Sequence, residues 1–298
     1  MNKNKIRSIK TAAKGYAFIG INLIGVLIFW TIPLIFSFII SISKWDYSKG
    51  IKGIKLTGLS NYIEMWKDEW FRASLINNII FTISFVLILV VLSFVVAYVL
   101  NEYVVGEKLV QLGLYLPYIV NIVAISAVWL ALFSNNGPVI GLLKKVGIEN
   151  PPVFIADLHW ALPTIVLICV WQNLGYTVIL FLSGMVNIPK DLYEAAAIDG
   201  ANVLQKIRYV TIPMLSGTTF FIVITSIINS FKVFGLINLM THGGPGTSTT
   251  MLVYNIYRTA FQYGKLEFAS AQGIVLLIII FIITWIQFRI QKKNEAAG

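Results

Sequence analysis

The chain has 298 residues, of which 57% are hydrophobic and 12% are charged, whereas soluble domains carry about 25% charged residues. A soluble fold has no interior large enough to hide so many apolar side chains, so the composition excludes an ordinary soluble domain and indicates an integral membrane protein. The formal net charge of +10 does not indicate nucleic-acid binding, because the basic residues lie in tails and loops, where a membrane protein meets anionic headgroups.

The N-terminal segment predicts an uncleaved first membrane span. Residues 1–14 hold five Lys or Arg residues and no acid, and the next charged residue is Lys44. The uncharged stretch between them is 29 residues long, whereas the apolar region of a signal peptide runs about 7–15 residues. We therefore expect a tail over residues 1–15, followed by a transmembrane helix over residues 16–43.

Five further uncharged stretches follow, and each exceeds the ~20 residues that a helix needs to cross the hydrocarbon core. They predict transmembrane helices near residues 77–100, 110–133, 161–185, 216–240 and 269–288. Backbone groups in lipid must be satisfied internally, so these long stretches are expected to be helices rather than strands. The sequence thus predicts an all-α membrane protein with six transmembrane helices.

Six spans place both termini on the same side, and the positive-inside rule indicates which side. The two tails and the loops at 101–108 and 186–215 hold 12 Lys or Arg residues, and the other three loops hold 10. The difference favours cytoplasmic termini, with the basic cluster in residues 1–14 as its main support. Residues 44–72 then form the first outer loop, and residues 289–298 form a cytoplasmic tail.

The outer loop at 44–72 contains the pattern of a short interfacial helix over about residues 60–71. Asn61, with Glu64 three residues on, resembles a capping box in which Asn61 is the N-cap. Aromatic residues follow, and they act either as anchors at the membrane surface or as ligand contacts. These are Tyr62, Trp66, Trp70 and Phe71.

The segment 186–215 differs from the other loops in length and pattern. Pro189 suits a first helical turn, alanines follow at 195–197, and Gly200 suits a left-handed position at the helix end. We expect a short helix, a tight turn and then a second, amphipathic helix. On composition alone, the segment is either an ordinary interhelical loop or a helix pair that enters the groove of a partner protein.

The motifs of this segment resemble those of a known family. Glu194-Ala195-Ala196, Asp199-Gly200-Ala201 and Ile212-Pro213 are similar to the EAA loop of binding-protein-dependent ABC importer permeases. The chain more narrowly resembles the sugar-permease family of type I importers, the maltose and glycerol-phosphate type, over about residues 16–288. Further stretches that resemble this family are Gly58–Tyr62, Leu75–Asn78, Trp171-Gln172, Ile188-Pro189, Thr241–Pro245 and Tyr257–Phe261.

The resemblance implies a fold and a set of partners. The fold is the type I ABC importer transmembrane domain, over residues 73–288, and the chain is a first-permease-like subunit that moves a sugar or oligosaccharide. Its partners are a second homologous permease, two ATPase subunits that carry ATP and Mg, and an extracytoplasmic solute-binding protein, in a bacterial or archaeal cytoplasmic membrane. The chain is then no enzyme and needs no cofactor of its own, and its sequence has no Gly-x-x-x-x-Gly-Lys-Ser/Thr motif to cradle phosphates.

The resemblance also implies functional residues. The positions that couple the chain to the ATPase are Glu194, Ala195, Ala196, Asp199 and Gly200. The loop that faces the binding protein carries Gly243, Gly244 and Pro245. Transport is then alternating access, in which closure of the ATPase dimer moves the two permeases as rigid bodies through the coupling helices.

Polar residues inside the predicted spans are candidates for the substrate pathway. The span at 161–185 carries Gln172, Asn173 and Tyr176. Amides that supply hydrogen bonds beside an aromatic platform suit a sugar. The alternative is that these residues make hydrogen bonds between helices, which also use Asn and Gln.

The span at 216–240 carries Thr225, Asn229 and Lys232, spaced to share one helical face. These residues either line a wet cavity or serve structural roles, with Lys232 paired or reaching the membrane surface. If Lys232 faces the cavity, it fits an acidic sugar or a phosphate ester.

Two other classes of membrane protein compete with this interpretation. A secondary transporter working alone predicts inverted repeats and paired charges near the midplane, and an ion channel predicts rings of charge or a filter loop. The spans contain almost no acids, and neither class explains the segment 186–215. No set of His, Cys and carboxylates has the spacing of a metal site, and His159 and His242 stand alone, so no metal is expected.

Overall fold

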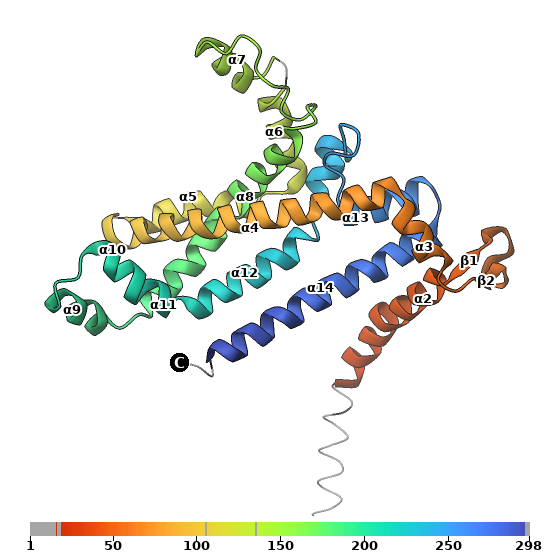
Figure 1. Ribbon diagram of the computed structural model, residues 1–298, viewed down its shortest axis with the longest axis horizontal. Helices are drawn as coiled ribbons and strands as arrows, with labels where there is room; N and C mark the ends of the chain where they lie inside the picture. Colours follow the sequence, from red (N-terminus) through yellow and green to blue (C-terminus); the bar gives the residue numbers. More distant parts are fainter. Residues whose placement is uncertain (1–15, 17–18, 105, 135, 296–298) are drawn as a thin grey trace, which may run out of the picture. The chain divides into compact units, whose positions relative to one another are not determined.

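The computed structural model describes residues 16, 19–104, 106–134 and 136–295 (Figure 1). The tail expected at residues 1–15 and the last three residues of the tail expected at 289–298 lie outside the described residues. The chain forms two compact units. One consists of Met1–Lys67 with Ile256–Val275, and the other of Asp68–Asn255 with Leu276–Gly298.

Helices that could cross a membrane dominate the described residues. Four are long and apolar enough by themselves: Ile19–Ser41, Glu69–Tyr103, Ala161–Val186 and Leu266–Gln291. Two further pairs of helices pass the same test when each bent pair is taken together, which raises the number of candidate spans to six. The prediction of an all-helical membrane fold is therefore confirmed, apart from one small ribbon of two strands.

In the first unit, the first membrane helix leads directly into a hairpin. The helix has a π-helical turn at Leu27–Thr31, followed by α2 at Ile32–Ser41. The strands β1 (Ser43–Trp45) and β2 (Ile54–Leu56) pair antiparallel around a 3₁₀ turn at Tyr47–Gly53. The sequence did not predict this ribbon, because strands of three residues are too short for a detectable alternation.

The short outer helix, α3, covers Ser60–Lys67. The prediction that Asn61 caps this helix is wrong, because its side chain is buried and donates to two backbone oxygens at the base of the hairpin, at 2.9 and 2.8 Å. The helix also ends before the predicted residue 71. The reason is that Asp68 caps the next helix, where its carboxylate accepts from the backbone N–H of Phe71 at 2.7 Å.

The last helix, α14, covers Leu266–Glu295 and begins in the first unit, after a π-helical turn at Arg258–Gln262. It is longer than the span predicted at 269–288 and continues through residues 289–295. No Gly or Pro occurs between residues 274 and 295 to end it.

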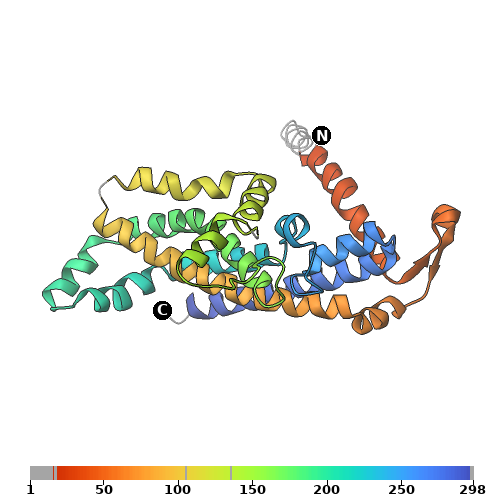
Figure 2. The same ribbon diagram turned by 90° about the horizontal axis from the view of Figure 1, so that it is seen from above.

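The second unit is built around two long helices that pack along each other (Figure 2), α4 (Glu69–Tyr103) and α8 (Ala161–Val186). The helix α5 (Glu107–Ile119) lies against α8, and α12 (Ser216–Ser230) lies against both long helices. The remaining helices are α6 (Ile122–Leu132), α7 (Pro138–Lys145), α9 (Lys190–Ile198), α10 (Val203–Lys206), α11 (Ile212–Met214) and α13 (Leu252–Tyr257), with π-helical turns at Ile207–Thr211 and Ile237–Thr241.

The contact between α5 and α8 depends on a glycine. A Cβ atom built on Gly175 would lie 2.0 Å from the backbone oxygen of Leu114. Only glycine allows the two helix backbones to approach so closely, as small residues do in membrane helix pairs. This close approach brings the aromatic residues of α5 onto the polar face of α8.

The span predicted as one helix at 110–133 is instead two helices, α5 and α6, bent by 97°. The side chain of Asn121 caps α6 by accepting from the backbone N–H of Val123 at 2.8 Å. The single-helix prediction is wrong because Asn121 takes a cap role, while apolar residues on both sides hide the break from the hydropathy pattern.

The span predicted as one helix at 216–240 is also interrupted. The helix α12 ends at Ser230, and a π-helical turn follows at Ile237–Thr241. The amide of Asn78 on α4 donates to the backbone oxygen of Ser230 at 3.3 Å, which gives the helix end a partner from outside the helix. The prediction of a continuous helix is therefore wrong.

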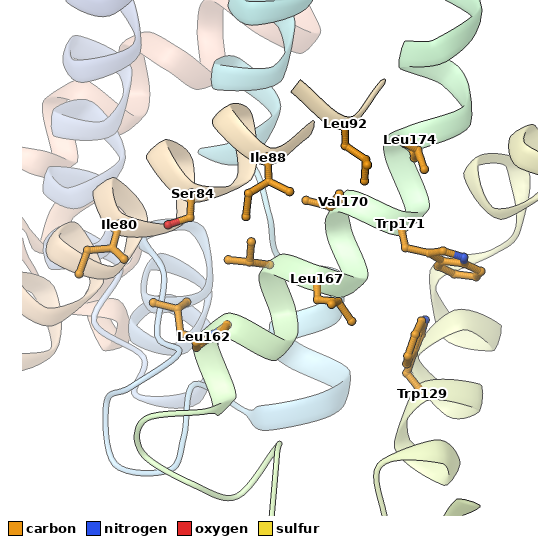
Figure 3. A pocket seen from close by; sticks show the side chains of 12 residues that line it. Ile80, Ser84, Ile88, Leu92, Trp129, Leu162, Leu167, Val170, Trp171 and Leu174 are labelled. Carbon is orange, nitrogen blue, oxygen red and sulfur yellow. The ribbon is translucent and has the colours of Figure 1, made fainter. Parts of the chain in front are cut away.

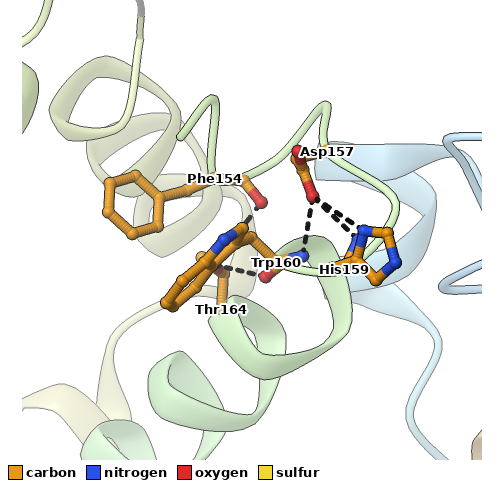
Figure 4. A network of polar contacts seen from close by, with 5 residues as sticks. All are labelled: Phe154, Asp157, His159, Trp160 and Thr164. Carbon is orange, nitrogen blue, oxygen red and sulfur yellow. Dashed lines mark hydrogen bonds and ion pairs between the residues drawn. The ribbon is translucent and has the colours of Figure 1, made fainter. Parts of the chain in front are cut away.

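The start of α8 is fixed by a turn around Asp157 (Figure 4). Its carboxylate accepts from the backbone N–H groups of His159 and Trp160 at 2.8 and 3.2 Å, which satisfies donors just before the helix begins. The hydroxyl of Thr164 donates to the backbone oxygen of Trp160 at 2.7 Å. His159 is thus part of an exposed turn, 3.8 Å from the same carboxylate.

Candidate functional site

The segment that resembles the EAA loop folds as two short helices joined at Gly200. Gly200 has φ +76°, the left-handed conformation that its place after α9 led us to expect. The N–H of Ala201 donates to the oxygen of Ala196 at 2.9 Å, which closes the end of α9 around this glycine. The first helix therefore ends in a well-defined turn rather than fraying.

The second helix of this segment begins with a cap that the sequence analysis missed. Asn202 and Gln205 form a reciprocal capping box, with hydrogen bonds of 2.9 and 2.8 Å between side chain and backbone in both directions. The pattern Asn-x-x-Gln in the sequence was the signal for it. Behind the two helices, the hydroxyl of Tyr193 lies 2.9 Å from that of Thr211, which is buried.

The helix pair exposes the residues that the resemblance singled out. No residue of α9 is buried, and Glu194, Ala195, Asp199 and Gly200 are exposed, with Ala196 half-buried. Ile198 is 87% exposed beside them. Leu192, Val203 and Leu204 of the same two helices are exposed as well, and several exposed apolar side chains together are typical of a contact surface for another protein.

A polar cleft brings together four of the six pathway candidates. Asn173 and Tyr176 come from α8, and Thr225 and Asn229 come from α12. The side-chain amide of Asn229 has no hydrogen-bond partner among the described residues. The cleft has a volume of about 20 Å³, which is room for roughly one water molecule.

Among the cleft residues that the sequence analysis missed is Tyr118. Its ring stacks on that of Tyr176 with 4.7 Å between centroids and 9° between planes. Tyr118 follows Pro117 near the end of α5, so a tyrosine beside a proline in a membrane span was the available signal. The two rings form an aromatic wall beside the amides and hydroxyls of α8 and α12.

Two pathway candidates lie outside this cleft. Lys232 is exposed and follows the end of α12 at Ser230. The prediction that it shares one helical face with Thr225 and Asn229 is therefore wrong. Gln172 is half-buried on α8 and is not part of the cleft lining.

A second cavity in the second unit is apolar (Figure 3). This groove of about 570 Å³ runs between α4 and α8, and Trp129 and Trp171 meet edge-to-face at 5.4 Å along its side. Apart from the two indole N–H groups, the hydroxyl of Ser84 is its main polar group. A polyhydroxylated ligand would lose its hydrogen bonds here, so the groove does not suit a sugar.

The loop over residues 241–251 is held by a dense set of hydrogen bonds. The side chain of Asn77 donates to the backbone oxygens of Thr247 and Thr250 at 2.7 and 3.0 Å. The carboxamide oxygen of Asn78 accepts from the N–H of Leu252 at 3.0 Å. The resemblance between Asn77-Asn78 and the family's pattern therefore has a physical counterpart, because these two side chains hold the loop to α4.

The glycines of this loop permit its path. Gly243 has φ +81°, and a Cβ atom there would lie 2.7 Å from the ring of Tyr254, whose hydroxyl donates to the backbone oxygen of His242 at 2.8 Å. Gly244 and Pro245 follow in a half-buried turn joined by a cis peptide bond. His242 lies at the surface of the turn.

No group of three or more His, Cys, Asp or Glu side chains in the part of the chain that the structure describes could hold a metal ion. The one cysteine, Cys169, is buried in an apolar cluster.

The chain matches a known protein family over most of its length. Residues 104–295 match the profile of the family described as "Binding-protein-dependent transport system inner membrane component". A curated relative, "Probable ABC transporter permease protein YesP" of Bacillus subtilis, is 34% identical over 290 residues, which cover 96% of this chain and 93% of the relative. The sn-glycerol-3-phosphate transport system permease protein UgpA of Yersinia pestis is 32% identical over 242 residues, 80% of this chain and 81% of that protein.

Two further comparisons extend the match. The lactose transport system permease protein LacF of Rhizobium radiobacter is 28% identical, with 94% of this chain and 95% of that protein covered. A crystal structure of a bacterial ABC transporter involved in the import of the acidic polysaccharide alginate superimposes with a TM-score of 0.84 over 98% of this chain and 99% of that chain. At 23% identity, this likeness shows a shared fold. The resemblance seen in the motifs is therefore confirmed, and the chain belongs to the family of binding-protein-dependent transport system inner membrane components.

Proposed function

We propose that this chain is the permease subunit of an ATP-driven ABC importer that moves a sugar or oligosaccharide across a bacterial or archaeal cytoplasmic membrane. The observation that carries the proposal is the exposed helix pair α9–α10. Its two helices are capped where they meet and carry no buried residue in α9. Such a pair suits a coupling element that a separate subunit contacts and moves. Its caps fix its conformation, and its surface is exposed for binding.

The helix pair needs a partner that supplies energy. Two ATPase subunits with ATP and Mg bind Glu194, Ala195, Ala196, Asp199 and Gly200, and both termini of the chain then lie on the cytoplasmic side. A second homologous permease completes the membrane pathway. An extracytoplasmic solute-binding protein docks above, against the loop with Gly243, Gly244 and Pro245.

The polar cleft is this chain's share of the substrate pathway. Its amides and hydroxyls are neutral, and Tyr118 and Tyr176 offer an aromatic wall, which suits a sugar ring. The proposal of a sugar draws on the relatives named for lactose and glycerol phosphate. Asn229 is exposed at this cleft, on the side that we propose faces the pathway shared with the second permease.

Lys232 and Gln172 belong to the pathway only if they face it in another conformation. Lys232 facing the pathway fits an acidic sugar or a phosphate ester. If Lys232→Met leaves the rate of uptake of a neutral sugar unchanged, Lys232 takes no part in neutral-sugar transport.

Purification from the native membrane tests the proposed assembly. The chain, tagged and extracted in mild detergent, is expected to bring down a second permease, an ATPase and a binding protein, which mass spectrometry identifies. The solute that the co-purified binding protein retains names the substrate. A chain that transports a solute in vesicles without any of these partners contradicts the proposal.

A charge reversal on the helix pair α9–α10 tests its coupling role. Glu194→Lys is expected to lower solute-stimulated ATP hydrolysis of the reconstituted complex roughly tenfold or more, because the loss of one partner of a charged contact buried in an interface costs about 2–5 kcal/mol. The control is Glu149→Lys, which reverses an exposed carboxylate in the loop after α7. If both variants keep normal stimulated hydrolysis in an assembled complex, the coupling assignment is wrong.

Removal of one ring tests the cleft. Tyr118→Leu is expected to raise the KM for transport about fivefold, since an aromatic contact contributes about 0.5–1.5 kcal/mol. Tyr103→Leu, at an exposed tyrosine that ends α4, is the matched control. A KM that changes equally in both variants would place Tyr118 outside the pathway.

A further inference from the structure

The hairpin after the first membrane span carries an excess of positive charge. Residues 43–56 contain four exposed lysines and a single acid: Lys44, Lys49, Lys52, Lys55 and Asp46. The ammonium group of Lys49 lies 3.2 Å from the carboxylate of Asp46. A hydrogen bond from Ser48 and the contact with Lys49 hold the pKa of Asp46 below its ordinary value, with a smaller effect from Lys55. The only acid of the hairpin is thus already engaged.

Two of the lysines face each other across the ribbon. The antiparallel register places Lys44 directly opposite Lys55, and such opposed residues have Cβ atoms about 4.5–5.5 Å apart. Neither ammonium group forms an ion pair with a carboxylate among the described residues. Like charges in this position destabilise a ribbon. An anion held between them would remove the repulsion, and a phosphate group has oxygens enough to meet both.

The opposite face of the ribbon is apolar and lies beside the membrane span. Strand alternation puts Trp45, Ile54 and Leu56 on the face away from the lysine pair. The ring of Trp45 meets that of Phe36 edge-on at 5.9 Å. Phe36 stands five residues before the end of α2, which is about 7–8 Å along the helix axis. The base of the hairpin therefore lies alongside the last turns of the span, at the depth where Trp rings gather in membranes.

The hairpin exposes further apolar side chains and makes two hydrogen bonds to the start of α14. Ile51 at its turn is 77% exposed, and Leu56 is 72% exposed. The hydroxyl of Tyr47 donates to the carboxylate of Glu267 at 2.8 Å and accepts from the backbone N–H of Leu266 at 2.9 Å. These contacts connect the turn of the hairpin to the start of α14.

We propose that the hairpin of residues 43–56 is a lipid-binding element that lies on the membrane surface. Its apolar side, with Ile51 and Leu56, enters the boundary of the acyl chains, and Lys44 and Lys55 bind the phosphate groups of anionic phospholipids. This is the arrangement of an interfacial amphipathic segment, with apolar residues below and lysines reaching the headgroups. An acidic protein partner would match the lysines, but it would not account for the contact of Trp45 with the side of the span.

Site-directed spin labelling in nanodiscs tests the proposal. The assembled transporter carries Cys169→Ala and one new cysteine, Ile51→Cys, and is placed in discs of phosphatidylglycerol alone or of phosphatidylcholine alone. Collision rates of the label with oxygen and with a water-soluble nickel complex report its depth. We expect the label to collide mainly with oxygen in phosphatidylglycerol and to become more accessible to nickel in phosphatidylcholine.

Two pairs of lysine variants separate specific binding from net charge. Lys44→Gln with Lys55→Gln is expected to shift the equilibrium between the lipid-bound and water-exposed positions of the hairpin by up to roughly 30-fold in phosphatidylglycerol, on the basis of the attraction of a lysine to an anionic surface. The matched control is Lys144→Gln with Lys145→Gln, which removes the same charge from the last turn of α7. The control is expected to leave the depth of the label unchanged.

Three results would overturn the proposal. A label at position 51 that stays accessible to nickel in both lipids shows that the hairpin does not lie on the membrane. A depth that is unaffected by the Lys44 and Lys55 changes shows that these lysines do not bind lipid. An unchanged depth together with a loss of binding-protein-stimulated ATP hydrolysis in the same variant identifies the hairpin as a protein docking surface instead.

Discussion

Single side chains of α4 decide the conformation of the loop over residues 241–251. Asn78 is completely buried, and its one amide serves two segments: it accepts from the N–H of Leu252 and donates to the oxygen of Ser230. Its hydroxyl-bearing neighbour one turn on, Thr82, lies 2.7 Å from the side chain of Ser230. Since lipid and core offer no water to replace these bonds, both backbone groups depend on this residue.

We expect Asn78→Ala to destabilise the protein, by about 1–3 kcal/mol for each buried backbone group left without a partner. Thermal unfolding in detergent measures the loss. Asn101→Ala, which removes an exposed amide from the same helix, is expected to change the stability by less than about 0.5 kcal/mol. Equal unfolding temperatures for the two variants would mean that the loop does not depend on Asn78.

Residue types predicted some of these roles and misassigned others. Gly200 was expected at a left-handed position, and it is found there, because few other residues tolerate that conformation. Asn61 and Asp68 are both good N-cap residues, but Asp68 is the cap and Asn61 is drawn into the hairpin by two backbone oxygens that lie 18 and 20 residues away in the sequence. A local pattern does not contain such distant partners.

At the scale of elements, the turn between α9 and α10 depends on the backbone conformation of Gly200. A Cβ atom at Gly200 would meet no neighbour within 4 Å. A substitution there therefore acts through backbone strain alone, because φ is +76°. For residues other than glycine, this conformation costs roughly 1–2 kcal/mol, although asparagine adopts it more readily.

We expect Gly200→Val to weaken coupling and Gly200→Asn to preserve most of it. The measurement is solute-stimulated ATP hydrolysis of the assembled complex, beside the amount of complex that survives purification. The ranking follows from backbone strain, since both side chains project into open space. If Val and Asn reduce coupling equally, the left-handed turn is not what the ATPase depends on.

Element lengths were harder to predict than element types. Hydropathy located the apolar stretches, but it could not show that the stretch at 110–133 bends by 97° or that α12 stops at Ser230. A polar side chain lies at each break: Asn121 caps α6, and Asn78 of α4 donates to the oxygen of Ser230 at the end of α12. The same breaks shape the polar cleft, because α5 ends one residue after Tyr118 and α12 ends one residue after Asn229.

At the scale of the whole molecule, the first span leaves most of its apolar surface uncovered by the rest of the chain. Within the most apolar stretch of the first span, Ile19–Ser41, only 6% is buried inside the chain, compared with 56% for the corresponding stretch of Ala161–Val186. A helix that is apolar on all sides and makes so few contacts with its own chain needs lipid or another subunit around it. The first span thus depends on lipid or on another subunit for cover, whereas α8 is covered mainly by its own chain.

The number of crossings is the remaining test of this architecture. If both bent pairs cross the membrane, the chain has six spans and both termini lie on the same side, which we propose is the cytoplasmic side. In a Cys169→Ala background, single cysteines at Glu64 and Glu149 should react with an impermeant maleimide on intact cells. Cysteines at Asn2, Glu194 and Ala297 should react only after permeabilisation.

Labelling of Glu149 from the cytoplasmic side alone would mean that α5 and α6 re-enter the membrane instead of crossing it. The termini would then lie on opposite sides, and the helix pair α9–α10 could not face the same compartment as the N-terminal tail.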